Sequence, residues 1–203
     1  MTAPHISNTS ADSSLSSTDD TEILRLVVAQ DRRAFEVLYT RYYPRLFRFA
    51  YRLTRRLDLI DEVINDAMLA VWQNAGSYRQ RSQVSSWIFG IAYHKSLKAL
   101  KRIGLQHGLT PLCEEELGVT DAEHADLQDW LAVALRQLPA EQRAVIELTY
   151  YYGYRYQEIA DMVGCPLNTV KTRMFYARRR LQQLLPDLAS FDTASKRHGS
   201  TQT

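Results

Sequence analysis

The chain has few cysteines, no clustered metal ligands and no long apolar run. Cys113 and Cys165 are its two cysteines, neither lies in a CxxC pair, and the five histidines are scattered. Disulfide frameworks and zinc sites need paired or clustered ligands, so neither is expected and both thiols are predicted to stay reduced. No apolar run approaches the roughly 20 residues of a membrane span, so membrane insertion is not expected.

The motifs of common enzyme classes are missing as well. The sequence contains no Gly-rich phosphate loop and no GxSxG elbow,. Asp61, Glu62 and Asp66 stand close together, but no histidine or other base accompanies them. The chain is therefore predicted not to be an enzyme and to use no cofactor or metal.

The two ends of the chain have little apolar content. Residues 1–20 are rich in Ser and Thr and lack the basic and apolar regions of a secretory signal,. We expect residues 1–20 and 187–203 to form disordered tails, and we expect a cytoplasmic location.

Charge is strongly segregated along the chain. Residues 22–102 carry 15 Lys and Arg against 7 Asp and Glu, whereas residues 103–125 carry five acids and no Lys or Arg. Basic blocks joined by an acidic strip are typical of two domains and a linker, and basic blocks suit a polyanionic partner. We predict domains at 21–102 and 126–186, joined by an acidic linker at 103–125.

The hydrophobic pattern is helical in both predicted domains. Apolar residues recur at three- and four-residue spacing through 21–102 and again from Asp126, and no alternating strand pattern occurs,. The predicted fold is all-α, with an N-terminal helical bundle and a C-terminal helix-turn-helix domain joined by a flexible linker.

The helix-turn-helix prediction comes from residues 157–173. An apolar helical pattern ends at Gly164, which suits the left-handed conformation that terminates a helix, and Pro166 suits the start of the next one,. That next helix is basic, as in proteins that insert a recognition helix into the major groove. Taken alone, the segment also fits an ordinary helical hairpin with a solvated basic face.

A basic and aromatic loop at 78–83 is the second candidate site. Arg79 and Arg81 lie between Tyr78 and Trp87. Aromatic rings stack on unpaired bases, at ~1–3 kcal/mol per base, while cations hold phosphates, so this composition suits single-stranded nucleic acid. Trp87 has an equally good interpretation as a core residue.

Together these features resemble the bacterial extracytoplasmic-function (ECF) sigma factors, over roughly residues 25–186. Residues 31–39 look like the opening helix of that family, 61–72 like its core-polymerase-binding helix, and 86–92 like its promoter-melting helix. Residues 138–143 and 169–178 resemble the two halves of its fourth-region domain.

The resemblance implies a dissociable subunit of bacterial core RNA polymerase that directs transcription initiation at chosen promoters. A helix at 59–75 would dock on the coiled coil of the polymerase's largest subunit through Asp61, Glu62, Asn65 and Asp66. The single-stranded non-template minus-ten element would be captured by Tyr78, Arg79, Gln80, Arg81, Ser82, Trp87, His94 and Lys95. The duplex minus-thirty-five element would be read by Asn168, Thr169, Lys171, Thr172, Arg173, Phe175, Tyr176 and Arg178. An anti-sigma protein is a further expected partner.

Two positions depart from the family pattern. Asn65 stands where a glutamine is usual, and His94 stands where many members have asparagine, which leaves the preferred minus-ten base open. Two other interpretations are a helix-turn-helix transcriptional regulator of the response-regulator output type and a polymerase-binding adaptor without promoter activity.

Overall fold

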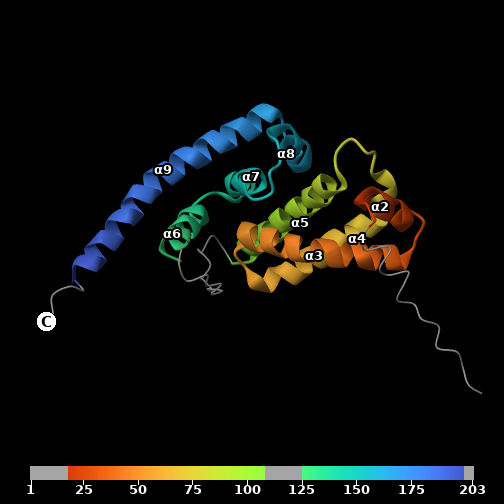
Figure 1. Ribbon diagram of the computed structural model, residues 1–203, viewed down its shortest axis with the longest axis horizontal. Coiled ribbons are helices and arrows are strands. Elements are labelled where there is room, and N and C mark those ends of the chain that lie inside the picture. Colours follow the sequence, from red (N-terminus) through yellow and green to blue (C-terminus); the bar gives the residue numbers. More distant parts are fainter. Residues whose placement is uncertain (1–17, 108–124, 199–203) are drawn as a thin grey trace, which may run out of the picture.

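The structure, a computed structural model, describes residues 18–107 and 125–198, and helices are the only regular elements in these two stretches (Figure 1). The all-α prediction is therefore confirmed for the described residues. Most of the predicted N-terminal tail, most of the acidic linker and Cys113 lie outside them. Of the predicted C-terminal tail only residues 199–203 do; the expectation of disorder is wrong for residues 187–198, which continue helix α9 (Leu167–His198). Helices α5 and α9 extend past the predicted domain limits at 102 and 186, and those limits stay predictions.

The N-terminal bundle consists of the longer helices α2 (Asp20–Val28), α3 (Arg32–Thr54), α4 (Ile60–Asn74) and α5 (Val84–His107), with short 3-10 turns at Leu57–Leu59 and Ala75–Ser77. The carboxylates of Asp19 and Asp31 accept hydrogen bonds from the first backbone N–H groups of α2 and α3, which otherwise lack partners,. The apolar stripes of the four helices meet in one core that excludes water. Its largest fully buried side chains include Tyr42, Phe49, Phe89, Leu38, Leu46 and Ile64.

The C-terminal unit consists of α6 (Ala125–Arg136), α7 (Ala140–Tyr150), α8 (Tyr156–Val163) and α9 (Leu167–His198). Gly164 ends α8 with φ +66°, as the sequence predicts, and Pro166 directly precedes α9. Val170, Met174 and Ala177 form the buried stripe that holds α9 against the other helices. The helix-turn-helix is thus present, and the far end of α9 projects away from the rest of the molecule (Figure 1).

The two units pack against each other along a contact that we call the seam. In the seam α7 lies against α3, and α8 lies across α5 (Figure 1). The Tyr152 ring packs 4.6 Å from that of Phe89, and its hydroxyl donates to the carbonyl of Arg45 at 3.1 Å. A side chain at Gly90 would meet the Met162 carbonyl at 3.0 Å, so the glycine allows α8 to approach closely,.

Candidate nucleic-acid interface

The first turns of α9 present an exposed polar and aromatic face. Asn168, Lys171 and Thr172 are exposed. Phe175 and Tyr176 are 61% and 51% exposed, with ring centroids 5.5 Å apart. A recognition helix reads base edges with polar groups and thymine methyls with apolar ones, and this face offers both. Thr169 is half-buried and lies at the edge of the face.

Two arginines of the predicted minus-thirty-five set contact side chains outside this face. The Arg173 guanidinium is half-buried, and its Nη1 donates to the sulfur of Cys165 at 3.9 Å. It also lies beside Tyr93 of α5, where it opposes the rise in the pKa of the Tyr93 phenol that burial causes. Arg178 donates to the hydroxyl of Tyr150 at 2.5 Å. Both guanidinium groups therefore face other helices in this structure.

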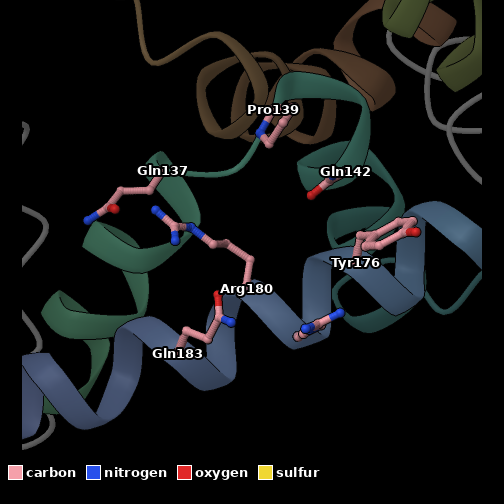
Figure 2. Close-up of a pocket in the computed structure, with 7 residues that line it drawn as sticks. Gln137, Pro139, Gln142, Tyr176, Arg180 and Gln183 are labelled. Atoms are coloured by element: carbon pink, nitrogen blue, oxygen red, sulfur yellow. The ribbon is translucent and has the colours of Figure 1, made fainter.

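A polar hollow of about 350 Å³ opens between α9 and the ends of α6 and α7. Figure 2 shows Arg180 extending from α9 towards Gln137, with Tyr176 beside Gln142 at the other end of the hollow. Because glutamine and arginine side chains make up most of its lining, the hollow has the character of a solvated basic groove beside the recognition helix and not of an apolar ligand pocket,.

The loop at 78–83 is fixed at both ends and exposed in its middle. The Tyr78 hydroxyl donates to the Ser82 carbonyl at 2.5 Å, and the Tyr78 ring packs 5.5 Å from that of Trp87. Arg79, Gln80 and Arg81 are exposed. The loop thus offers cations next to an aromatic pair, which is the arrangement that the sequence predicts.

Trp87 and His94 lie on the side of α5 that faces the C-terminal unit. Both line a cavity of about 230 Å³ between α5 and α8, together with Ile91 from α5 and Asp161 and Met162 from α8. Trp87 is half-buried, whereas Ile88 and Phe89 are buried in the core. Candidate DNA-binding residues from both units, Arg173 among them, therefore meet at the seam.

The four predicted polymerase-binding residues form an exposed ridge along α4, and each has a partner within the molecule. Asp61 and Asn65 accept hydrogen bonds from two tyrosines of α3, Tyr43 and Tyr39, each at 2.9 Å. Glu62 and Asp66, the other two, pair with cations of α5. The ridge is thus polar and held from both sides.

Sequence reasoning missed three residues of this region. Tyr39 and Tyr43 hold the ridge from the α3 side, and Leu69 extends it as an apolar side chain that is 52% exposed. The i, i+4 spacing of the two tyrosines was visible in the sequence, but it did not indicate which helix their hydroxyl groups would reach.

The seam contains a buried charged group that the sequence analysis also missed. Glu147 is 1% exposed and pairs with Arg52 at 3.2 Å. Burial raises the pKa of the Glu147 carboxyl, and the Arg52 charge opposes that rise. Arg143, one turn earlier on α7, is buried as well, and burial lowers its pKa to about 10.

Metal and membrane features are absent from the part of the chain that the structure describes. Within it, no group of three or more His, Cys, Asp and Glu side chains is placed to hold a metal ion. None of the described helices is both long and apolar enough to cross a membrane.

Comparison with known proteins places both units in one family. The Sigma-70 region 2 family matches residues 38–104, and the Sigma-70, region 4 family matches residues 128–181. The ECF RNA polymerase sigma factor SigM of Mycobacterium tuberculosis is 38% identical over 168 residues, which cover 82% of this chain and 84% of that protein. The ECF RNA polymerase sigma factor RpoE of Cereibacter sphaeroides is 30% identical over 76% of this chain and 87% of its own length.

Solved structures agree with these relatives. The sigma factor RpoE of Bartonella quintana, solved in complex with the anti-sigma factor NepR, matches with a TM-score of 0.63 and 28% identity, over 75% of this chain and 96% of that one. CnrH, solved with the cytosolic domain of CnrY, matches in fold with a TM-score of 0.62. The chain belongs to the ECF sigma factors, which bind core RNA polymerase and direct it to specific promoters.

Proposed function

We propose that this sigma factor reads the minus-thirty-five duplex with the exposed face of α9. The observation that carries the proposal is the pairing of a well-formed helix-turn-helix with a polar and aromatic face on its second helix. Lys171 offers hydrogen-bond donors, and Phe175 offers apolar contact to a thymine methyl. The Thr172 hydroxyl donates to the Asn168 carbonyl at 2.8 Å and therefore offers an acceptor. Asn168, Thr169 and Tyr176 complete the face, and Arg173 and Arg178 join it after leaving Tyr93 and Tyr150.

The minus-ten element is bound by α5 and the loop before it. Trp87 and Tyr78 offer aromatic faces on which an unpaired base can stack, and the exposed Arg79 and Arg81 can hold phosphates,. Extruding a base from the duplex costs a few kcal/mol, which such contacts can offset. Gln80, Ser82, His94 and Lys95 complete the proposed surface.

The α4 ridge binds the polymerase. Asp61, Glu62, Asn65 and Asp66 are exposed along one side of the helix, where they can accept hydrogen bonds from cations on the polymerase,. The exposed Leu69 adds an apolar contact at the end of the ridge.

The groups on all three proposed surfaces bind and orient their partners. The protein is proposed to carry out no covalent chemistry, to use no cofactor and to act in the cytoplasm.

Promoter binding requires the seam to open. Trp87 of α5 and Arg173 of α9 are half-buried at it, so the packed arrangement keeps a candidate group of each DNA element away from DNA, whereas His94 lies at its exposed edge. An anti-sigma partner, of the kind found with the Bartonella quintana relative, would favour the closed arrangement, whereas polymerase and promoter would favour the open one,.

Run-off transcription tests the function directly. Purified protein is added to sigma-free bacterial core polymerase on genomic fragments, and discrete start sites that vanish without the protein are the expected result. Tight polymerase binding without transcripts would favour an adaptor instead. Promoter-fragment binding with neither polymerase binding nor transcripts would favour a helix-turn-helix regulator.

A further inference from the structure

Two ion pairs join the proposed polymerase-binding helix to the proposed strand-binding helix. Arg102 of α5 donates to both carboxylate oxygens of Glu62 on α4, at 2.6 and 2.7 Å. Seven residues earlier on α5, Lys95 pairs with Asp66 of α4 at 3.4 Å. Glu62 and Asp66 are four residues apart on α4, and so they share one face of that helix. Their partners are seven residues apart and share one face of α5. The two ion pairs are therefore consecutive contacts between the same two helices.

The two carboxylates belong to the proposed polymerase-binding site on α4, and the two cations lie on α5, the helix of the proposed minus-ten site. Glu62 and Asp66 are half of the α4 ridge proposed to bind polymerase. Lys95 belongs to the minus-ten surface, and Arg102 lies two turns farther along the same helix. An arginine or lysine held by a carboxylate is a poorer partner for phosphate than a free one, because its charge is already neutralised.

We propose that Glu62 and Asp66 withhold Arg102 and Lys95 from the non-template strand until RNA polymerase takes the two carboxylates. The proposal rests on the proposed function and assigns Arg102 as a further nucleic-acid-binding residue. Polymerase binding at α4 then increases the positive charge available on α5, so that the strand-binding surface is completed only within the holoenzyme.

Exposure makes this exchange feasible. The side chains of Glu62 and Arg102 are 45% and 49% exposed, and those of Asp66 and Lys95 are 51% and 29% exposed. Ion pairs at such positions are weak and are readily exchanged for another partner of the same charge. A cation on the polymerase can therefore replace Arg102 at Glu62 without disturbing the core of the bundle.

The first experiment imitates polymerase binding by neutralising the two carboxylates. Binding of the full-length Glu62→Gln/Asp66→Asn variant to a fluorescent single-stranded oligonucleotide is measured by anisotropy over a range of salt concentrations. We expect affinity to rise about 3- to 10-fold at low salt, as two weak ion pairs are removed. The slope of log affinity against log salt should steepen by about 1.4, since each freed cation adds about 0.7 on a single strand.

A matched control separates this effect from net charge. The Glu22→Gln/Asp58→Asn variant gains the same charge and also breaks two exposed ion pairs, with Arg25 and Arg56. It should show a much smaller rise in affinity and no comparable change in slope. Equal gains by the two double variants, or no gain by Glu62→Gln/Asp66→Asn over the unaltered protein, would overturn the ion-pair exchange. Run-off transcription by the unaltered protein decides the proposed function separately.

A second experiment examines Arg102 in the holoenzyme. Arg102→Gln should shorten the lifetime of promoter complexes challenged with heparin about 2- to 5-fold, and should lower the salt slope by about 0.7, because one phosphate contact is lost. Lys101→Gln, on a different side of the same helix, is the control. Identical behaviour of the two variants would show that Arg102 does not reach the strand and would overturn the assignment.

Discussion

At the scale of single residues, Arg143 connects the C-terminal unit to the N-terminal bundle. Its guanidinium donates to the carbonyls of Leu135 at 2.9 Å and Leu138 at 2.9 Å, near the end of α6. It also donates to the carbonyl of Leu53 at 3.0 Å, at the end of α3. The last carbonyls of a helix have no partner within it, so one buried arginine satisfies the ends of two helices.

Replacing Arg143 with alanine should destabilise the protein. We expect the free energy of unfolding to fall by about 2–4 kcal/mol, because several buried carbonyls lose their donor at once. Urea denaturation followed by circular dichroism measures the change. Arg179→Ala, at an exposed position of α9, should stay within about 0.5 kcal/mol of the unaltered protein,. A similarly small effect at Arg143 would mean that water replaces its hydrogen bonds.

Arg173 is the second residue whose environment matters for function. It must leave Tyr93 and Cys165 before it can reach a base, and a bidentate contact to guanine would then discriminate by ~1–3 kcal/mol,. We expect Arg173→Ala to relax discrimination at one minus-thirty-five position, as measured by competition among single-substitution promoters. Lys171→Ala serves for comparison. Equal loss on every promoter would assign Arg173 to phosphate instead.

At the scale of elements, α7 is the helix that joins the two units. Arg143 and Glu147 lie one turn apart on it and face α3. The sequence carries local signals of this helix and of its start, namely the apolar period and Pro139. It did not predict that a glutamate of α7 is buried, because that depends on a helix 95 residues away in the sequence.

The contact between α7 and α3 should depend on pH through Glu147. Arg52, Arg55 and Arg143 surround this carboxyl, but burial dominates and raises its pKa in the closed arrangement. Opening the seam returns the carboxyl to its ordinary value of about 4.3 and releases a proton. The contact should therefore be most stable on the acidic side and weaken as pH rises from the ordinary value through the raised pKa.

Energy transfer between dyes on the two units, followed from pH 4.5 to pH 8, measures this dependence. Glu147→Gln cannot ionise, so its seam should stay closed across the range, whereas Glu36→Gln, at an exposed position of α3, should behave like the unaltered protein. A pH profile unchanged by Glu147→Gln would assign the dependence to another group.

At the scale of the whole molecule, the seam depends on one close approach between helices. Gly90 allows α5 to lie against the backbone of Met162 in α8. Aromatic rings from both units also pack against each other: Tyr152 and Tyr154 of the C-terminal unit lie against Phe89 of α5. Because protein cores are close-packed, a small group added there cannot be absorbed without moving one helix.

Gly90→Ala should shift the molecule towards the open arrangement. The added methyl group would meet the Met162 carbonyl at 3.0 Å, so the radius of gyration in small-angle scattering should increase and energy transfer across the seam should fall. Gly104→Ala is the matched control, since it lies on the same helix with no neighbour within 4 Å of the added carbon. If both variants scatter alike, the seam tolerates the methyl group and closure does not depend on Gly90.

The sequence by itself determined the all-α fold, the helix-turn-helix and the family, because helical periodicity, the glycine and proline of the turn, and the order of the motifs are local features. It also placed Lys171, Phe175 and Arg79 on surfaces that are exposed in the structure. Only the tertiary structure decided that Arg173 turns towards Tyr93, that His94 faces α8, and that Glu62 pairs with Arg102. The physical reason is that these outcomes depend on contacts between helices far apart in the chain, where packing and burial select among orientations that the local pattern allows equally.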